Sequence, residues 1–148
     1  MKYEFEHAVG CPVPREFAWR FWTRVENWAV VDSSVESVRL DGPFAAGTKG
    51  VTKPRGLPPT EWELTEVEAA RRAVISIALP GAAFSFEWLF EESAGGGTRI
   101  TQRVRLAGER AADYAGALPE FEAGIPAGMR SLVAAMSKLL DRRGELNV

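Results

Sequence analysis

Residues 83–107 read AFSFEWLFEESAGGGTRITQRVRLA, and this stretch decides the fold. Two runs of alternating residues flank a glycine-rich turn. One side of both runs is apolar apart from a single glutamine: Phe84, Phe86, Trp88, Phe90, Ile100, Gln102, Val104 and Leu106. The other side carries charges and hydroxyls: Ser85, Glu87, Glu91, Arg99, Thr101, Arg103 and Arg105. A period of two predicts strands with one buried face. The short turn makes them antiparallel, with Glu–Arg pairs across the wet face.

The same signals extend through the chain on both sides of this hairpin. Strand-like runs bounded by Pro, Gly and other turn residues predict seven strands: Lys2–Val9, Val35–Asp41, Thr48–Lys53, Thr60–Glu68, Arg72–Leu79, Ala83–Glu92 and Thr98–Ala107. Between the first two strands, apolar residues recur at steps of three and four from Phe17 to Trp28. That spacing predicts a helix or a pair of helices.

The C-terminal segment from Ala111 to Arg143 predicts a helix that Pro119 and Pro126 interrupt. Its last part carries the clearer apolar stripe: Ile125, Met129, Leu132, Val133, Met136, Leu139 and Leu140. The element order is therefore strand, helix pair, six strands and terminal helix. An antiparallel sheet with helices on one side is an α+β architecture. A length of 148 residues without a linker or an internal repeat predicts one domain over residues 1–148.

Composition excludes several classes of function. The formal net charge is −2, from 18 basic and 20 acidic residues, so no strong basic field points to nucleic acid. One cysteine and one histidine allow neither an internal disulfide nor a Cys-rich or His-rich metal site, and we expect no metal and no cofactor. The acidic start lacks the apolar run of a signal peptide, and no stretch is apolar enough to insert stably in a membrane. These features predict a cytoplasmic protein.

Several short segments, taken in order, resemble one family. They are Val9-Gly10-Cys11-Pro12, Phe17-Ala18-Trp19, Val25-Glu26-Asn27-Trp28, Val35–Pro43, Gly47-Thr48-Lys49-Gly50 and Gly96–Thr101. Nearly the whole chain resembles the START-related, birch-pollen-allergen-like superfamily (SRPBCC), in its bacterial polyketide cyclase/dehydrase branch. The resemblance implies a helix-grip fold, in which a curved seven-stranded antiparallel sheet wraps around the long C-terminal helix. It also implies two short helices between strands 1 and 2, and a cavity between the sheet and the terminal helix.

The alternation and this resemblance together predict a ligand site on the inner face of the sheet. Four apolar residues form its expected wall, two on the sheet and two on the terminal helix: Phe86, Trp88, Met129 and Met136. His7 and Gln102 share the inner parity. The resemblance makes the first and last strands neighbours, which would bring these two polar groups into the same cavity. The simpler interpretation is that all six side chains only fill or satisfy the core.

His7 is the only evident general base, because imidazole titrates near neutral pH. A catalytic pair needs a second titratable group close by. Glu61, Glu63 and Glu66 are candidates, but an irregularity in their strand would change which of them faces inward.

Cys11 lacks an activating base nearby in the sequence and is not expected to act as a nucleophile. The tryptophans of the helical segment and the fourth strand are expected to pack in the core: Trp19, Trp22, Trp28 and Trp62.

Three classes of function remain open at this point. We expect first a binding or carrier protein for a small hydrophobic molecule, such as a lipid, a polyketide or an aromatic metabolite. The second class is an enzyme resembling polyketide cyclases and dehydratases, with His7 as its base. The third is an interaction module resembling the heat-shock ATPase activators, which would use Arg99, Arg103 and Arg105 on the outer face. Either a monomer or a homodimer is expected.

Overall fold

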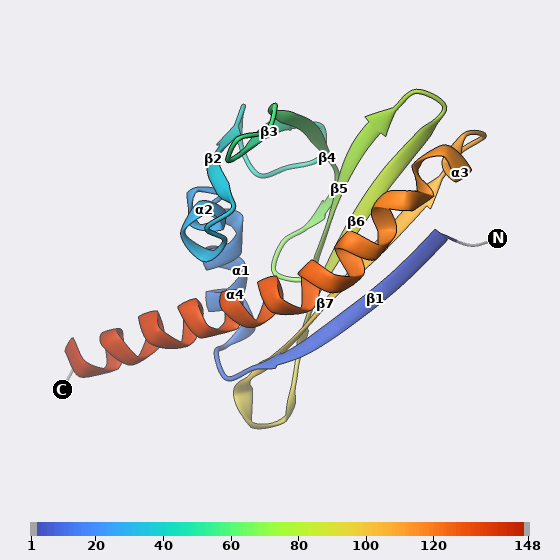
Figure 1. The fold of residues 1–148 in the computed structure, drawn as a ribbon. Helices are drawn as coiled ribbons and strands as arrows, with labels where there is room; N and C mark the ends of the chain where they lie inside the picture. The colour runs from blue at the N-terminus through green and yellow to red at the C-terminus, as the bar shows by residue number, and fades with distance from the viewer. Residues whose placement is uncertain (1–2, 147–148) are drawn as a thin grey trace.

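Seven antiparallel strands form one sheet in the order β1-β7-β6-β5-β4-β3-β2 (Figure 1). The computed structural model describes residues 3–146. Its strands are β1 (Tyr3–Cys11), β2 (Val35–Leu40), β3 (Lys49–Pro54), β4 (Thr60–Glu68), β5 (Arg72–Leu79), β6 (Ala82–Glu92) and β7 (Thr98–Ala107). The helices are α1 (Arg15–Thr23), α2 (Glu26–Val31), α3 (Ala111–Tyr114) and α4 (Leu118–Leu146), with short 3₁₀ turns η1 (Ala94–Gly96) and η2 (Ala115–Ala117).

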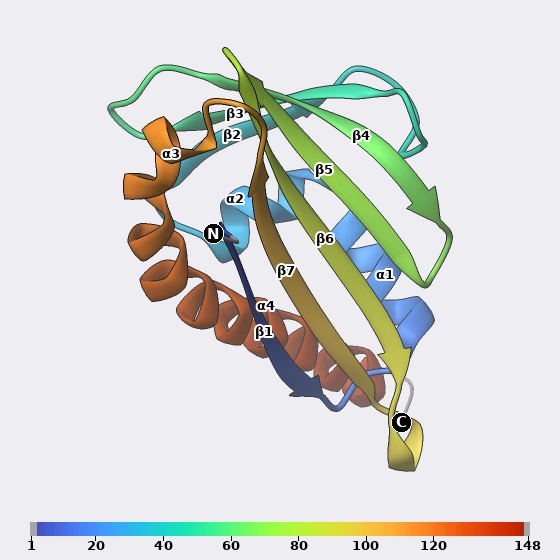
Figure 2. The ribbon, with the colours of Figure 1, turned by 90° about the vertical axis from the view of Figure 1, so that its right-hand side faces the viewer.

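The sheet is a meander from β2 to β7, and β1 joins its far edge beside β7. The register pairs His7 of β1 with Gln102 of β7, and Gln102 in turn with Trp88 of β6. Figure 2 shows the sheet curving around α2 and α4. The predicted α+β class, the seven strands and the helix-grip arrangement are confirmed. Strands β4, β5 and β7 have the predicted bounds, and the other strand ends lie within two residues of the predicted ones, apart from the predicted start at Lys2, which lies outside the described residues.

The helical segment after β1 divides into two helices, α1 and α2. Two side chains of α2 donate hydrogen bonds to the last backbone carbonyls of α1. Asn27 donates from Nδ2 to the carbonyl of Phe21 at 2.8 Å, and Trp28 donates from Nε1 to the carbonyl of Trp22 at 2.7 Å. The last carbonyls of a helix have no partner within it. The two side-chain bonds pair the carbonyls of Phe21 and Trp22, so α1 can end at Thr23 and a second helix can begin at Glu26.

The terminal helix is longer than its prolines predict. Pro119 lies in the first turn of α4, where backbone N–H groups have no partner within the helix in any case. Pro126 lies inside α4, and the helix continues through it to Leu146. The predicted interruption at Pro126 is therefore wrong. Its missing N–H leaves the carbonyl of Glu122 without a helical donor, but Glu122 is exposed and water can reach it.

The outer face of the sheet carries the predicted Glu–Arg pairs. Arg103 bonds Glu87 at 2.8 Å and lies 3.1 Å from Glu6, so one guanidinium joins three strands. Arg72 continues this row from Glu87 at 2.6 Å to Glu66 at 2.9 Å. The outer face is therefore a surface of mixed and largely paired charge.

A β-bulge in β4 determines on which side of the sheet its acidic residues lie. The register with β5 shifts between Leu64 and Glu66, so Thr65 and Glu66 both point outward. Trp62 and Leu64 before the bulge are buried on the inner face. The predicted irregularity is thus present, and it keeps the carboxylates of this strand away from the core.

The core lies between the concave face of the sheet and the helices. One cluster joins α1, α4 and the inner faces of the central strands, and it contains the fully buried Phe90, Ile100 and Met136. A second, smaller cluster around Phe84 and Val104 closes the end of the sheet beside α3. Within residues 3–146, no helix has the length and apolarity that crossing a membrane requires.

Candidate functional site

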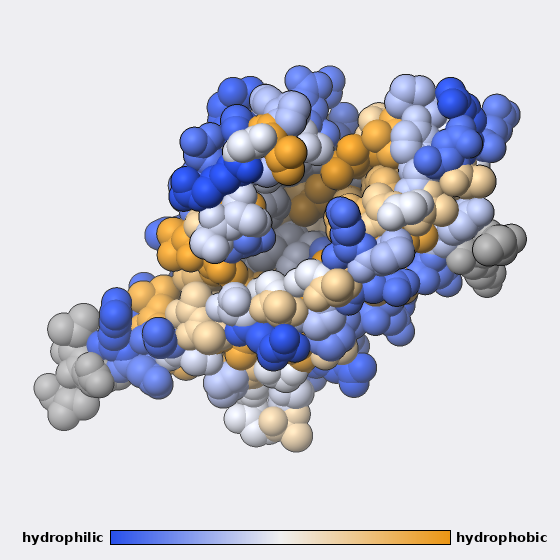
Figure 3. Space-filling view, in the orientation of Figure 1, coloured by the Kyte–Doolittle hydropathy of each residue, from blue (hydrophilic) through white to orange (hydrophobic). Residues whose placement is uncertain are grey.

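A cavity of about 680 Å³ lies between the sheet, α2 and α4. The space-filling view shows its opening above α4, with a hydrophobic interior (Figure 3). Most of its lining is apolar or aromatic: Trp22, Trp28, Val31, Val35, Trp62, Ile75, Ile77, Leu79, Phe84, Phe86, Trp88, Phe121, Ile125, Met129 and Leu132. Pockets of this size and character are those that hold small molecules in proteins.

Two glycines of α4 leave room for this cavity. Gly124 and Gly128 both line it, and a Cβ added at either position would meet no atom within 4 Å. Gly128 falls on the helix face between Phe121, Ile125 and Leu132, which also line the cavity. A side chain at 128 would therefore enter the open space. Sequence reasoning missed both residues, although two glycines four positions apart in a helical run were a visible signal.

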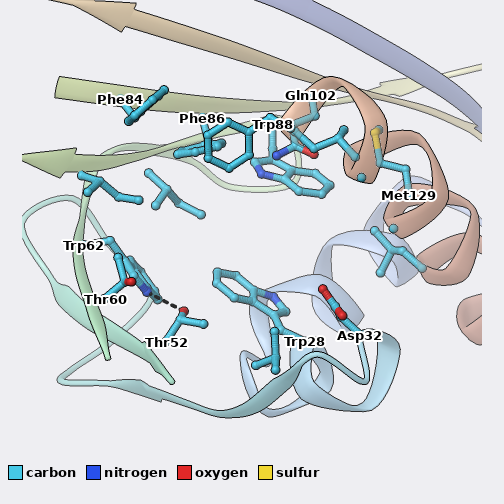
Figure 4. Close-up of a pocket in the computed structure, with 18 of the residues that line it drawn as sticks. Trp28, Asp32, Thr52, Thr60, Trp62, Phe84, Phe86, Trp88, Gln102 and Met129 are labelled. Carbon is cyan, nitrogen blue, oxygen red and sulfur yellow. Dashed lines mark hydrogen bonds between the residues drawn. The ribbon is translucent and has the colours of Figure 1, made fainter. Parts of the chain in front are cut away.

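Four tryptophans form one continuous wall of the cavity. The ring centroids are 5.4 Å apart between Trp62 and Trp28, 5.8 Å between Trp28 and Trp22, and 4.9 Å between Trp22 and Trp88. Two of the indole N–H groups are already used, since Trp62 donates to the Thr52 hydroxyl at 2.9 Å and Trp28 to a backbone carbonyl. These residues pack against one another as expected, and they also line the cavity. Figure 4 labels three of them, Trp28, Trp62 and Trp88.

Phenylalanines form the other end of the cavity. Phe121 of α4 meets Phe84 and Phe86 of β6 edge to face, with ring centroids 5.3 and 5.4 Å apart. The aromatic row predicted on β6 therefore divides along its length. Phe84, Phe86 and Trp88 line the cavity, whereas Phe90 is 1% exposed and packs against Trp19 and Trp22.

Polar groups are few in this lining. Gln102 is the buried one, at 7% exposure, and it projects from β7 beside Trp88 (Figure 4). Thr52 and Thr60 contribute hydroxyls from β3 and β4. Asp32 and Glu120 contribute carboxylates, and both residues are exposed, which places them at the rim. The Asp32 carboxylate accepts hydrogen bonds from the backbone and the hydroxyl of Ser34 at 2.9 and 2.6 Å.

The structure places four of the six predicted site residues in the lining and two outside it. Phe86, Trp88, Gln102 and Met129 line the cavity. His7 is half-buried on β1, a strand that packs against α4, and it is not among the residues that line the cavity. Met136 lies beyond Leu132 on α4 and is fully buried in the core. Both residues, which we expected to bound the cavity, therefore lie outside its lining.

For acid–base or nucleophilic chemistry, the described lining offers the rim carboxylates of Asp32 and Glu120 but no histidine, cysteine or lysine. His7 lies outside the cavity, and Glu66 is on the outer face in an ion pair with Arg72. The Cys11 thiol is buried at the end of β1, and burial raises its pKa. A thiol held protonated in this way is a poor nucleophile. The arrangement is therefore suited to enclosing an apolar molecule.

Comparisons with known proteins agree with this geometry. The family model for polyketide cyclase/dehydrase and lipid transport matches residues 2–141. The Zhui aromatase/cyclase of Streptomyces sp. R1128 superposes with a TM-score of 0.74 at 14% identity, covering 95% of this chain and 96% of that one. Ara h 8.0201 superposes with a TM-score of 0.73 at 15% identity, covering 93% and 99%.

A third solved structure shares the same fold. Truncated norcoclaurine synthase from Thalictrum flavum superposes with a TM-score of 0.71 at 9% identity, covering 93% of this chain and 94% of that one. At sequence identities this low, the superpositions show that the three proteins share the fold of this chain and show nothing more. A search of curated protein sequences finds no match. The family model spans nearly all of the sequence, and the chain therefore belongs to the polyketide cyclase/dehydrase and lipid transport family, within the SRPBCC superfamily.

Proposed function

We propose that this protein binds and carries a small, largely apolar molecule in the cavity between the sheet and α4. The observation that carries the proposal is the open, aromatic-lined space of about 680 Å³ beside two glycines of the terminal helix. Removing apolar surface from water contributes about 25 cal/mol per Å², so a guest that fills such a space is held without a covalent bond. Phe86, Trp88 and Met129 supply apolar contact to this guest, and Gln102 supplies its polar anchor.

A cyclase or dehydratase activity is the main alternative, and the position of His7 argues against it. General acid–base catalysis requires the base within hydrogen-bond reach of the reacting atom. His7 is not among the residues that line the cavity, and the two lining carboxylates stand at its exposed rim. A carrier does not need the His7 imidazole or the rim carboxylates to gain or lose a proton. We therefore expect His7→Ala to leave ligand binding unchanged.

The interaction module is supported less well than the carrier. Its proposed surface is the row of arginines on the outer face of β7. Arg103 is already paired with Glu6 and Glu87, and Arg105 is paired with Glu4 at 3.2 Å. A partner with an acidic surface would have to compete with these internal carboxylates.

Titration with the neutral fluorescent dye Nile red tests the carrier function. The test variant is Gly128→Phe, whose ring enters the cavity, and the matched control is Ala127→Phe on the exposed side of the same helical turn. We expect the wild type and the control to bind the dye with similar affinity. Gly128→Phe should bind at least about tenfold more weakly while its circular dichroism spectrum is retained. Equal binding by all three proteins would refute the proposal.

A further inference from the structure

Two neighbouring polar groups face the cavity without partners. Trp88 of β6 and Gln102 of β7 are register partners, and both line the cavity. Among the hydrogen bonds formed within residues 3–146, none involves the Gln102 carboxamide or the Trp88 indole N–H. Gln102 is 7% exposed. Arg15 Nε is the only fully buried side-chain polar atom without a hydrogen-bond partner within residues 3–146. The polar atoms of Gln102 and Trp88 therefore remain accessible, and a molecule in the cavity can form hydrogen bonds with them.

These two side chains together present a defined set of donors and acceptors. The carboxamide offers an N–H donor and a carbonyl acceptor, and the indole offers one further N–H donor. Side chains of register partners on adjacent antiparallel strands lie about 5 Å apart at Cβ. A ligand group that reaches Gln102 therefore lies beside Trp88 as well. Figure 4 shows Trp88 and Gln102 next to each other on the sheet side of the space, above Trp28 and Asp32.

The charge of the lining sets a second condition on the ligand. Of the described residues that line the cavity, none is Lys, Arg or His, whereas Asp32 and Glu120 are both acidic. An anion bound beside Gln102 would leave water without gaining a cation, which is costly. The rim carboxylates would add repulsion to this cost.

We infer that the ligand is a neutral molecule whose apolar body carries an adjacent hydrogen-bond acceptor and donor, as in a carboxamide or a lactam. The acceptor receives the N–H groups of Gln102 and Trp88, and the donor is directed to the carbonyl of Gln102. Ionised fatty acids and other carboxylates are excluded from this class. The inference rests on the proposed function, since it names the class of molecule that the same cavity binds.

Three probes of nearly the same shape test this inference at neutral pH. They are 2-naphthamide, which has an acceptor and a donor, 2-acetylnaphthalene, which has the acceptor alone, and 2-naphthoate, which is an anion. Their dissociation constants are measured by isothermal titration with the wild type, Gln102→Leu and Gly128→Phe. We expect the amide to bind roughly three- to tenfold more tightly than the ketone. The carboxylate should bind at least about tenfold more weakly than the ketone.

The variants separate this inference from the proposed function. Gln102→Leu should abolish the advantage of the amide over the ketone while retaining binding of the ketone, and Gly128→Phe should weaken both. A carboxylate that binds the wild type as tightly as the amide overturns the inference, as does an amide advantage that persists in Gln102→Leu. The wild-type series decides the question of charge even if Gln102→Leu does not fold. If none of the probes nor Nile red binds the wild type, the proposed function fails as well.

Discussion

The indole ring of Trp62 lies directly on the backbone of Gly50, its register partner across β3 and β4, so that a Cβ at position 50 would overlap the ring. From this position the Trp62 N–H reaches the hydroxyl of Thr52, and its face stacks on Trp28 at 5.4 Å. The glycine therefore allows the tryptophan wall of the cavity to continue onto the β3 side of the sheet.

Gly50→Ala should destabilise the fold, because the added methyl group forces the buried Trp62 ring out of its position. Overpacking of this kind costs about 1–3 kcal/mol, to be measured by urea unfolding. Gly10→Ala is the matched control, since a Cβ at that strand position meets nothing within 4 Å. A loss of stability no greater than that of Gly10→Ala would show that the ring adjusts freely.

Pro126→Ala should stabilise the protein. The substitution restores a backbone N–H that can donate to the carbonyl of Glu122 inside α4. Proline is about 3 kcal/mol less favourable than alanine inside a helix, and its stiffness in the unfolded chain offsets part of this, so we expect a gain of about 1–2 kcal/mol. Thermal and urea unfolding measure this gain. A lower unfolding midpoint would mean that packing around α4 depends on the proline ring.

The ion pair between Glu66 and Arg72 should make stability depend on pH in the acid range. The Arg72 guanidinium, 2.9 Å away, lowers the pKa of Glu66 below its ordinary value. A carboxyl whose pKa is lowered on folding stabilises the protein above its unfolded pKa, near 4.3. This contribution is lost as the pH falls through the folded pKa.

The measurement for this pair is the urea midpoint of the wild type and of Glu66→Gln between pH 2 and 6. The difference between the two proteins should be largest at pH 6 and should shrink as the pH falls. Glu66 is on the surface, so added salt should reduce the difference at pH 6 as well. A difference that does not change with pH would show that the pair contributes nothing.

Much of the sheet can be predicted from the sequence because alternation alone sets the face of each residue. Glu87 and Arg103, assigned to the wet face from their parity, form an ion pair at 2.8 Å. Gln102, assigned to the inner face, lies in the cavity lining. Strand parity holds wherever the pleat is regular, and the bulge between Leu64 and Glu66 is where it changes.

The cavity could not be outlined in the same way, because its shape depends on how α4 crosses the sheet. His7 has inner parity, but it lies on the edge strand β1, which packs against α4, and it is not part of the cavity lining. Met136 lies on the apolar stripe of α4, yet that part of the helix is buried in the core. Gly128 has no side chain and so adds nothing to an apolar pattern, although it leaves space for the cavity. Pro126 is a local helix breaker that tertiary packing overrides.

Two-dimensional ¹H–¹⁵N NMR during titration with 2-acetylnaphthalene tests the central claim most directly. The chain has five tryptophans, of which Trp22, Trp28, Trp62 and Trp88 line the cavity and Trp19 lies outside the lining. We predict that the indole N–H signals of Trp28, Trp62 and Trp88 and the side-chain amide of Gln102 shift most, with a smaller change at Trp19. Shifts confined to Trp19 or to the outer face of the sheet around Arg103, with the cavity signals unchanged, would contradict the account.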